Sequence, residues 1–126
     1  MNRRTAREKA FQVLFQMDIN AVDPSEALEH VLEKPVQDSF LRELVFGVNE
    51  KKSSIDQQIA DHLQNWSLNR LASVEKTVLR IATYELLYND EVPTGVAINE
   101  AVELAHKFGD EKSGKFINGV LSKMLK

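Results

Sequence analysis

The sequence predicts an all-α fold, a bundle of about seven helices that forms one domain over residues 1–126. Apolar residues recur three and four positions apart in nearly every segment, which is the period of one face of an α-helix. No segment alternates apolar and polar residues as a half-buried strand does. The composition is that of a globular protein, with 43% hydrophobic and 28% charged residues, and the chain is long enough to bury a core.

The first half of the chain predicts a series of amphipathic helices. An apolar stripe over residues 6–17 indicates the first. "DPSEALEHVLE" indicates the second, because Asp23 can cap its start and Pro24 suits the first helical position, where the N–H has no partner. The pattern continues over residues 37–63, where Gly47 and the following "KKSS" favour a kink or break.

The second half is predicted to hold the central helix. "NWSLNRLAS" is a connector, with Trp66 as an apolar anchor and Ser73 as the cap of the next helix. In "VEKTVLRIATYELLY" apolar residues surround most of the helical circumference, which is typical of a buried helix. "NDEVPTG" predicts a turn, and helical periodicity resumes over residues 96–108 and 111–125.

"GDEKSGKF", residues 109–116, fits the phosphate-binding loop pattern except at Phe116, where magnesium binding requires Ser or Thr. Such a loop follows a buried strand, whereas the preceding "AINEAVELAHKF" is an amphipathic helix. We therefore interpret Gly109 as a left-handed helix C-terminal cap. Asp110 and Glu111 then lie at the start of the next helix, where its dipole favours acids.

Catalytic and metal-binding patterns are weak. The chain has no Cys, which excludes disulfides and thiolate metal ligands. "ELAH" places Glu103 and His106 at the spacing used in di-iron bundles, but no second such pair occurs, so we interpret it as a solvated face. "SVEK" lacks the companion motifs of acyl-transfer enzymes. The sequence thus predicts no enzyme, no metal site and no cofactor.

No segment is apolar enough to predict membrane insertion. The longest stretches without Lys, Arg, Asp or Glu are eight residues, for example residues 10–17, whereas a spanning helix needs about 18 apolar residues. The basic start is not followed by the apolar core of a signal peptide. We therefore expect a cytoplasmic protein without membrane contact.

Charge is distributed unevenly around a net charge of −3. Residues 1–16 carry a local +3, residues 18–38 carry −5, and residues 107–126 carry +3. Two basic ends on an acidic body suggest a local basic patch rather than general affinity for nucleic acid.

Two groups of residues in the basic ends are candidates for RNA contact. The first helix contains Arg3, Arg4 and Arg7, which are either a solvated terminus or a phosphate-contacting cluster. Phe116 either packs at the edge of the core or offers a ring for base stacking. The stacking interpretation adds its neighbours Lys112, Lys115 and Asn118.

Several motifs resemble the NusB family of bacterial transcription antitermination factors. They are "RRTAREKAFQVLFQMD", "LRIATYEL", "VAINEAVELA" and "KFINGVL", in that order and spacing, with Trp66 and Arg70 between them. The resemblance covers nearly the whole chain. Similar bundles form an N-terminal domain of ribosomal RNA cytosine methyltransferases; because the sequence ends at Lys126, without length for a catalytic domain, we expect the stand-alone factor.

The resemblance implies two three-helix subdomains packed across each other, without catalysis. It implies binding of the single-stranded boxA element of leader transcripts, notably of ribosomal RNA operons, together with NusE, a small-subunit ribosomal protein. The pair would load onto elongating RNA polymerase with other Nus factors. The family is often acidic where this chain has Lys112, and the resemblance leaves monomer and homodimer open.

The same resemblance assigns roles to individual residues. Arg3, Arg4 and Arg7 would meet RNA, as would Phe116 of "KFING", and Glu75 would lie on the NusE side. An alternative from the residues themselves remains open. In that alternative the chain is a purely protein-binding helical scaffold without direct RNA contact, and its basic ends are solubilising charge.

Overall fold

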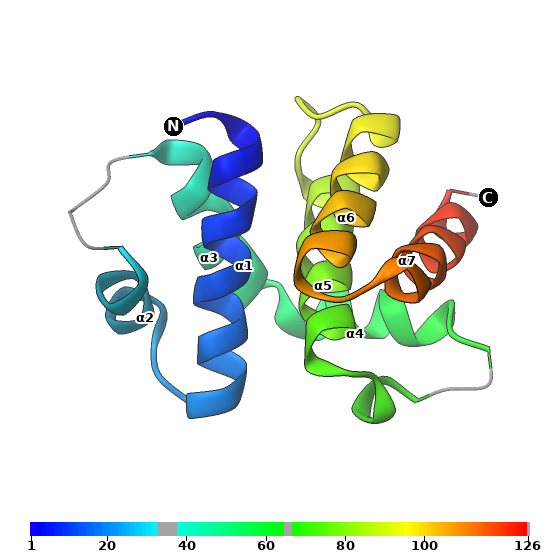
Figure 1. Ribbon diagram of the computed structural model, residues 1–126, viewed down its shortest axis with the longest axis horizontal. Helices are drawn as coiled ribbons and strands as arrows, with labels where there is room; N and C mark the ends of the chain where they lie inside the picture. The colour runs from blue at the N-terminus through cyan, green and yellow to red at the C-terminus, as the bar shows by residue number, and fades with distance from the viewer. Residues whose placement is uncertain (33–37, 65–66, 126) are drawn as a thin grey trace.

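The computed structural model describes residues 1–32, 38–64 and 67–125, and Trp66 lies outside these ranges. Within the described residues there are seven α-helices and one short 3₁₀ helix, and no strand (Figure 1). The all-α prediction is confirmed. The helices are α1 (Arg3–Asn20), α2 (Pro24–Val31), α3 (Ser39–Glu50), α4 (Lys52–Asp61), α5 (Ser73–Tyr88), α6 (Thr94–Phe108) and α7 (Glu111–Met124), with the 3₁₀ helix η1 (Leu68–Arg70) before α5.

The helices form two groups that pack side by side. In the first group α1 packs against α2 and α3, and in the second α5 packs against α4, α6 and α7 (Figure 1). The two groups meet where α1 lies along α5. The expectation was two groups of three helices; the described residues give three helices in the first group and four in the second, because α4 packs on α5.

The central helix of the bundle is α5, as its apolar circumference predicts. Every residue from 77 to 85 on this helix is buried. Across the junction between the groups, the ring of Phe11 on α1 stacks on that of Phe108 on α6, with centroids 4.2 Å apart. The junction is therefore part of one continuous core and fixes α1 relative to α6.

Local predictions about helix ends were partly correct. Asp23 caps α2, since its carboxylate accepts a hydrogen bond from the Glu26 N–H at 2.9 Å, and Pro24 is the first helical residue. Ser73 was predicted as a cap but is the first residue of α5, and no side chain caps that helix.

Of two predictions that involve glycines, one was wrong and one was correct in part. Gly109 follows α6 with φ −124°, so it is not in the left-handed region, although its N–H still bonds to the Ala105 carbonyl oxygen at 2.8 Å. The break predicted from Gly47 and "KKSS" does occur, but it falls at Lys51, the first residue of "KKSS", while Gly47 lies inside α3. Both glycines have negative φ angles, which any residue can adopt.

Candidate nucleic-acid interface

The basic start of the chain folds into the first turns of α1. Asn2 caps the helix, with its side-chain oxygen accepting from the Thr5 N–H at 2.8 Å. This cap places Arg3 and Arg4 in the first turn, where their side chains are 50% and 63% exposed. The Arg3 guanidinium lies 4.7 Å from the centre of the Phe40 ring. These two arginines are therefore accessible to a ligand.

Arg4 pairs with a carboxylate on α6. Its Nη2 and Nε donate to the two carboxylate oxygens of Glu100 at 2.8 and 3.2 Å. This hydrogen bond is the main reason that the pKa of Glu100 is lowered, and the charges of Arg4 and Arg7 act in the same direction. The pair thus ties the exposed first turn of α1 to α6.

Arg7 is in a different environment, because its side chain is only 3% exposed. Its Nη2 donates to Glu85 Oε1 at 2.7 Å, and its Nε lies 3.0 and 3.1 Å from the two Glu85 oxygens. Burial raises the pKa of Glu85, while the hydrogen bonds and charge of Arg7 act in the opposite direction. RNA contact by Arg7 stays a prediction that would require this ion pair to open.

The second basic segment forms the start of α7. Asp110 caps this helix by accepting from the Ser113 N–H at 2.8 Å, which lowers the pKa of Asp110. Residues 109–116 are thus a helix end and a helix start, in agreement with our rejection of a phosphate-binding loop.

Three of the four predicted RNA-contacting side chains of α7 are exposed to solvent. The exposed ones are Lys112, Lys115 and Asn118, whereas Phe116 is half-buried and packs against the edge of the core. Phe116 therefore has features of both interpretations, a packing contact on one side and an accessible part on the other.

An open groove with a volume of about 560 Å³ joins the two basic ends of the chain. Arg4, Lys115 and Asn118, which the sequence singled out in separate segments, line the same groove. Arg3, Lys112 and Phe116 are not among its lining residues. The groove also contains residues that the sequence analysis passed over or assigned to a solvated face, namely Asn99, Glu100, Glu103 and His106.

The geometry of the described residues does not suggest metal chemistry. Among them, no group of three or more His, Asp or Glu side chains is placed to hold a metal ion. Within the same part of the chain, no helix has both the length and the apolar character needed to cross a membrane.

Glu75, the residue predicted on the partner side, lies in the first turn of α5 and is half-buried. The next residue, Lys76, is 3.8 Å from Asp18 near the end of α1. Asp18 in turn accepts from Arg80 at 3.3 Å, and Arg80 also pairs with Asp56 of α4 at 2.8 Å. The start of α5 is therefore fixed against the end of α1 and against α4.

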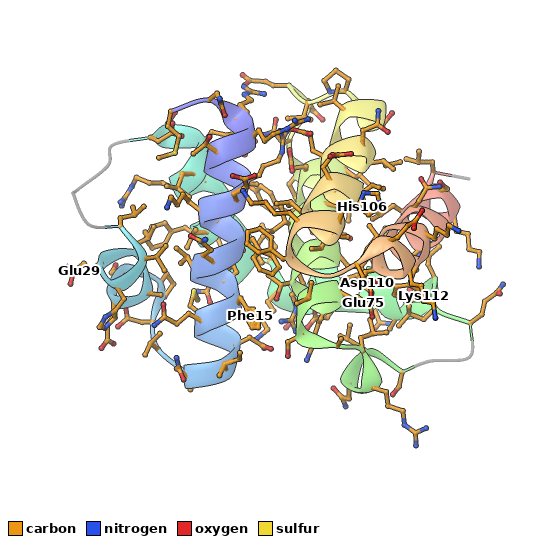
Figure 2. The ribbon with its side chains drawn as sticks, in the orientation of Figure 1. Phe15, Glu29, Glu75, His106, Asp110 and Lys112 are labelled. Atoms are coloured by element: carbon orange, nitrogen blue, oxygen red, sulfur yellow. The ribbon has the colours of Figure 1, made fainter. Side chains whose placement is uncertain are left out.

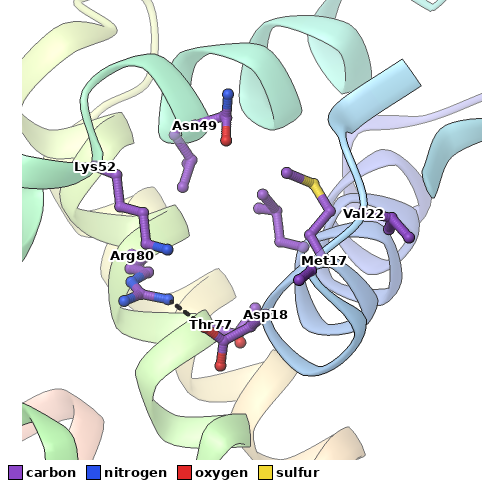
Figure 3. A pocket seen from close by; sticks show the side chains of 10 residues that line it. Met17, Asp18, Val22, Asn49, Lys52, Thr77 and Arg80 are labelled. Atoms are coloured by element: carbon purple, nitrogen blue, oxygen red, sulfur yellow. Dashed lines mark hydrogen bonds and ion pairs between the residues drawn. The ribbon is translucent and has the colours of Figure 1, made fainter. Parts of the chain in front are cut away.

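Two depressions lie near this end of α1. One, of about 260 Å³, has an apolar wall that includes Met17 and Val22 and a polar wall that includes Lys52 and Arg80 (Figure 3). The other is a shallow apolar site of about 400 Å³ lined by Phe11, Phe15, Ile19 and Phe108 among others. Ile19 is 59% exposed and adds accessible apolar surface to this site.

The fold and these surfaces define the class as an all-helical binding protein. Its basic helix ends meet at an open polar groove, and a separate partly apolar surface lies at the far end of α1.

Comparison with known proteins identifies the family. The family model for the NusB family matches residues 4–126. The transcription antitermination protein NusB of Oceanobacillus iheyensis is 58% identical over 125 residues, covering 99% of each chain. A crystal form of T. maritima NusB superposes with a TM-score of 0.90 at 41% identity, covering 98% of this chain and 90% of that one. A structure described as antitermination factors NusB and NusE in complex with dsRNA superposes with a TM-score of 0.88 at 35% identity, covering 97% and 94%.

This chain belongs to the NusB family. The resemblance drawn from its sequence motifs is therefore confirmed. Because its relatives are transcription antitermination proteins, the prediction that it is not an enzyme is confirmed as well.

Proposed function

We propose that this protein binds single-stranded boxA RNA together with NusE and loads onto elongating RNA polymerase, notably on ribosomal RNA operons. The observation that carries the proposal is the groove in which Arg4 of α1 meets Lys115 and Asn118 of α7. The solved relative that contains NusE and double-stranded RNA supports NusE and RNA as the two kinds of partner.

We assign the RNA-contacting roles by exposure and chemistry. Arg3, Arg4, Lys112 and Lys115 would neutralise phosphates, which fixes the position of the strand. The ring of Phe116 would stack on a base, and the Asn118 amide would bond to a base edge. Arg7 would act indirectly, because its bond to Glu85 and its 3.5 Å contact with Glu100 hold the helix that carries Arg4.

The NusE side would be the far end of α1 together with the start of α5. Glu75 lies there, and the apolar site around Phe15 and Ile19 has the character of a protein contact. This surface is formed by residues different from those that line the RNA groove. RNA and NusE would therefore bind at the same time.

The RNA proposal is tested by a salt series with the boxA element and a scrambled single strand. Each phosphate contact on single-stranded RNA contributes about 0.7 to the log–log slope of affinity against salt. The double variant Arg3→Gln/Arg4→Gln should therefore bind boxA more weakly, with a slope reduced by about 1.4. Discrimination against the scrambled strand should largely persist, because phosphate contacts position the RNA and base contacts specify it.

A matched control removes two other exposed cations, as Lys52→Gln/Arg70→Gln, and should keep the slope of the wild type. If the log–log plots of boxA affinity against salt were parallel for all three proteins, the RNA role of the first turn of α1 would be contradicted. Addition of NusE separates the two surfaces: Glu75→Lys should weaken NusE binding while leaving the RNA affinity of the isolated protein unchanged. If the wild type binds neither RNA with or without NusE, the protein-binding scaffold is the correct interpretation.

A further inference from the structure

The groove between α6 and α7 has two facing walls of polar residues. On α6 the wall consists of Asn99, Glu103 and His106, and on α7 it consists of Glu111, Lys115 and Asn118. In both helices the three residues are spaced i, i+4, i+7, so each row lies along one helix face. All six are exposed. The groove is therefore lined by side chains that are available for hydrogen bonding.

Gly114 sets how closely the two walls approach. A Cβ atom at this position would overlap the imidazole of His106, so the ring lies directly against the backbone of α7. From the loop that joins them the two helices diverge (Figure 1). The groove is thus closed at its His106 end and open toward Asn99 and Arg4.

The charges inside the groove do not suit a phosphate. Glu100, Glu103 and Glu111 contribute three carboxylates, whereas Arg4 and Lys115 are the two Arg or Lys side chains that line it. Arg4 is already engaged by Glu100. No salt bridge within the described part of the chain involves Glu103 or Glu111. Coulomb repulsion between these carboxylates and a phosphate would keep the RNA backbone out of the groove interior.

The same side chains suit the edge of a nucleobase. A carboxylate accepts hydrogen bonds, and in base recognition it pairs with an exocyclic amino group such as N4 of cytosine. An amide both donates and accepts, so Asn99 and Asn118 complement the remaining positions of a base edge. Single-stranded RNA presents such edges because its bases are unstacked.

We propose that the groove between α6 and α7 receives an unstacked base that carries an exocyclic amino group, and that Asn99 and Glu103 read its edge. This inference rests on the proposed RNA-binding function and adds two base-contacting residues to it, of which Glu103 determines the specificity. The phosphates follow the outer rim, where the exposed cations lie, while the base points inward. Cytosine is preferred over uracil, because N4 of cytosine donates to Glu103 whereas O4 of uracil meets its carboxylate as a second acceptor.

Oligo(C) and oligo(U) of equal length test the proposal, because both are pyrimidine strands with the same backbone charge. The wild type should bind oligo(C) more tightly. In Glu103→Ala the preference for oligo(C) should fall by about five- to a hundredfold, the range expected for loss of a good base contact. Asn99→Ala should weaken binding of both oligomers, because an amide can donate to or accept from either base. The salt slope should not change, since neither variant removes a cation.

Glu29→Ala is the matched control, because it removes the same charge from an exposed position on α2, in the other group of helices from His106 (Figure 2). It should keep the preference of the wild type. Circular dichroism should be the same for all four proteins, since the replaced side chains are exposed.

Two outcomes would overturn the proposal. If Glu103→Ala strengthens binding of oligo(C) and oligo(U) equally, Glu103 only repels phosphates and reads no base. If the wild type binds boxA but does not distinguish oligo(C) from oligo(U), the base-reading groove is wrong while the proposed RNA-binding function stands. Absence of binding to boxA and to both oligomers would overturn both.

Discussion

The three arginines of α1 lie within five positions of one another but have different surroundings. Arg3 and Arg4 are exposed, whereas Arg7 is buried against Glu85. The sequence could not separate them, because the partner of Arg7 is 78 positions away in the chain. A local count of charge therefore overestimates the cations that are free to meet a ligand.

Breaking the buried pair should be costly for stability. Arg7→Gln leaves the Glu85 carboxylate buried without its counterion, so we expect the free energy of unfolding to fall by about 3–5 kcal/mol. The double variant Arg7→Met/Glu85→Met removes both charges and should recover most of that loss, because the desolvation cost disappears as well. Urea denaturation measures both values.

The exposed neighbour provides the control for this prediction. Arg4→Gln should lower the stability much less than Arg7→Gln, since an exposed ion pair contributes less than a buried one. If Arg7→Gln were as stable as Arg4→Gln, the Arg7–Glu85 pair would not be closed in solution. Arg7 would then be available to RNA, as the sequence originally suggested.

At the scale of helices, Gly47 shows how a residue that predicts a break can instead permit close packing. It lies within α3, and a Cβ atom at this position would overlap the ring of Tyr84 on α5. Tyr84 is buried, and its hydroxyl donates to Glu43 at 3.2 Å, so the ring is held in place. The glycine therefore allows α3 to approach α5.

Gly47→Ala should destabilise the protein. Alanine is the better helix former by about 1 kcal/mol, but overpacking against a fixed ring costs about 1–3 kcal/mol, so we expect a net loss. Gly119→Ala is the matched control, because a Cβ there meets nothing within 4 Å. It should stabilise α7 by up to about 1 kcal/mol. Equal gains from both substitutions in thermal unfolding would contradict the close approach of α3 and α5.

At the scale of the whole molecule, the sequence predicted what depends on local spacing. Helical period indicated the segments of α1, α5, α6 and α7, and the apolar circumference of α5 indicated its central place. The sequence did not predict contacts between distant segments, such as Phe11 on Phe108 or Arg80 with Asp18 and Asp56.

The candidate site was predictable only in part for the same reason. Lys115 and Asn118 followed from their position beside Phe116, and Arg4 followed from the basic start of the chain. Their meeting in one groove depends on how α1 docks beside α6, which no local pattern encodes. Asn99, Glu103 and His106 share an i, i+4, i+7 spacing that could have indicated a polar row, but an exposed helix face gives the same pattern.

The docking of α1 on α6 through Glu100 should make the stability of the whole molecule depend on pH in acid. The pKa of Glu100 is lowered from 4.5, chiefly by its hydrogen bond with Arg4. A carboxyl group with a lowered folded-state pKa contributes stability that is present above its unfolded pKa and is lost as pH falls through the folded pKa. Protonation of Glu100 thus weakens the contact between the two groups of helices.

Glu85 makes stability depend on pH in the opposite direction. Burial raises its pKa, so the folded protein favours the protonated form. The contribution of Glu85 to stability is fully present below its unfolded pKa, near 4.5, and is lost as the pH rises through its raised folded-state pKa. Loss of stability below about pH 4.5 therefore reports Glu100 and other groups with lowered pKa, such as Asp110.

Urea unfolding from about pH 7 to about pH 3 should show this directly. Glu100→Gln should be less stable than the wild type at neutral pH, because it loses the charged bond to Arg4, and its stability should fall less steeply below about pH 4.5. Asp110→Asn keeps an N-cap side chain that accepts the Ser113 N–H. The stability of Asp110→Asn should also fall less steeply below about pH 4.5. Because this substitution leaves α1 docked on α6, its RNA affinity should equal that of the wild type. If the curves of Glu100→Gln and the wild type ran parallel through the acid range, the Arg4–Glu100 bond would not form in solution.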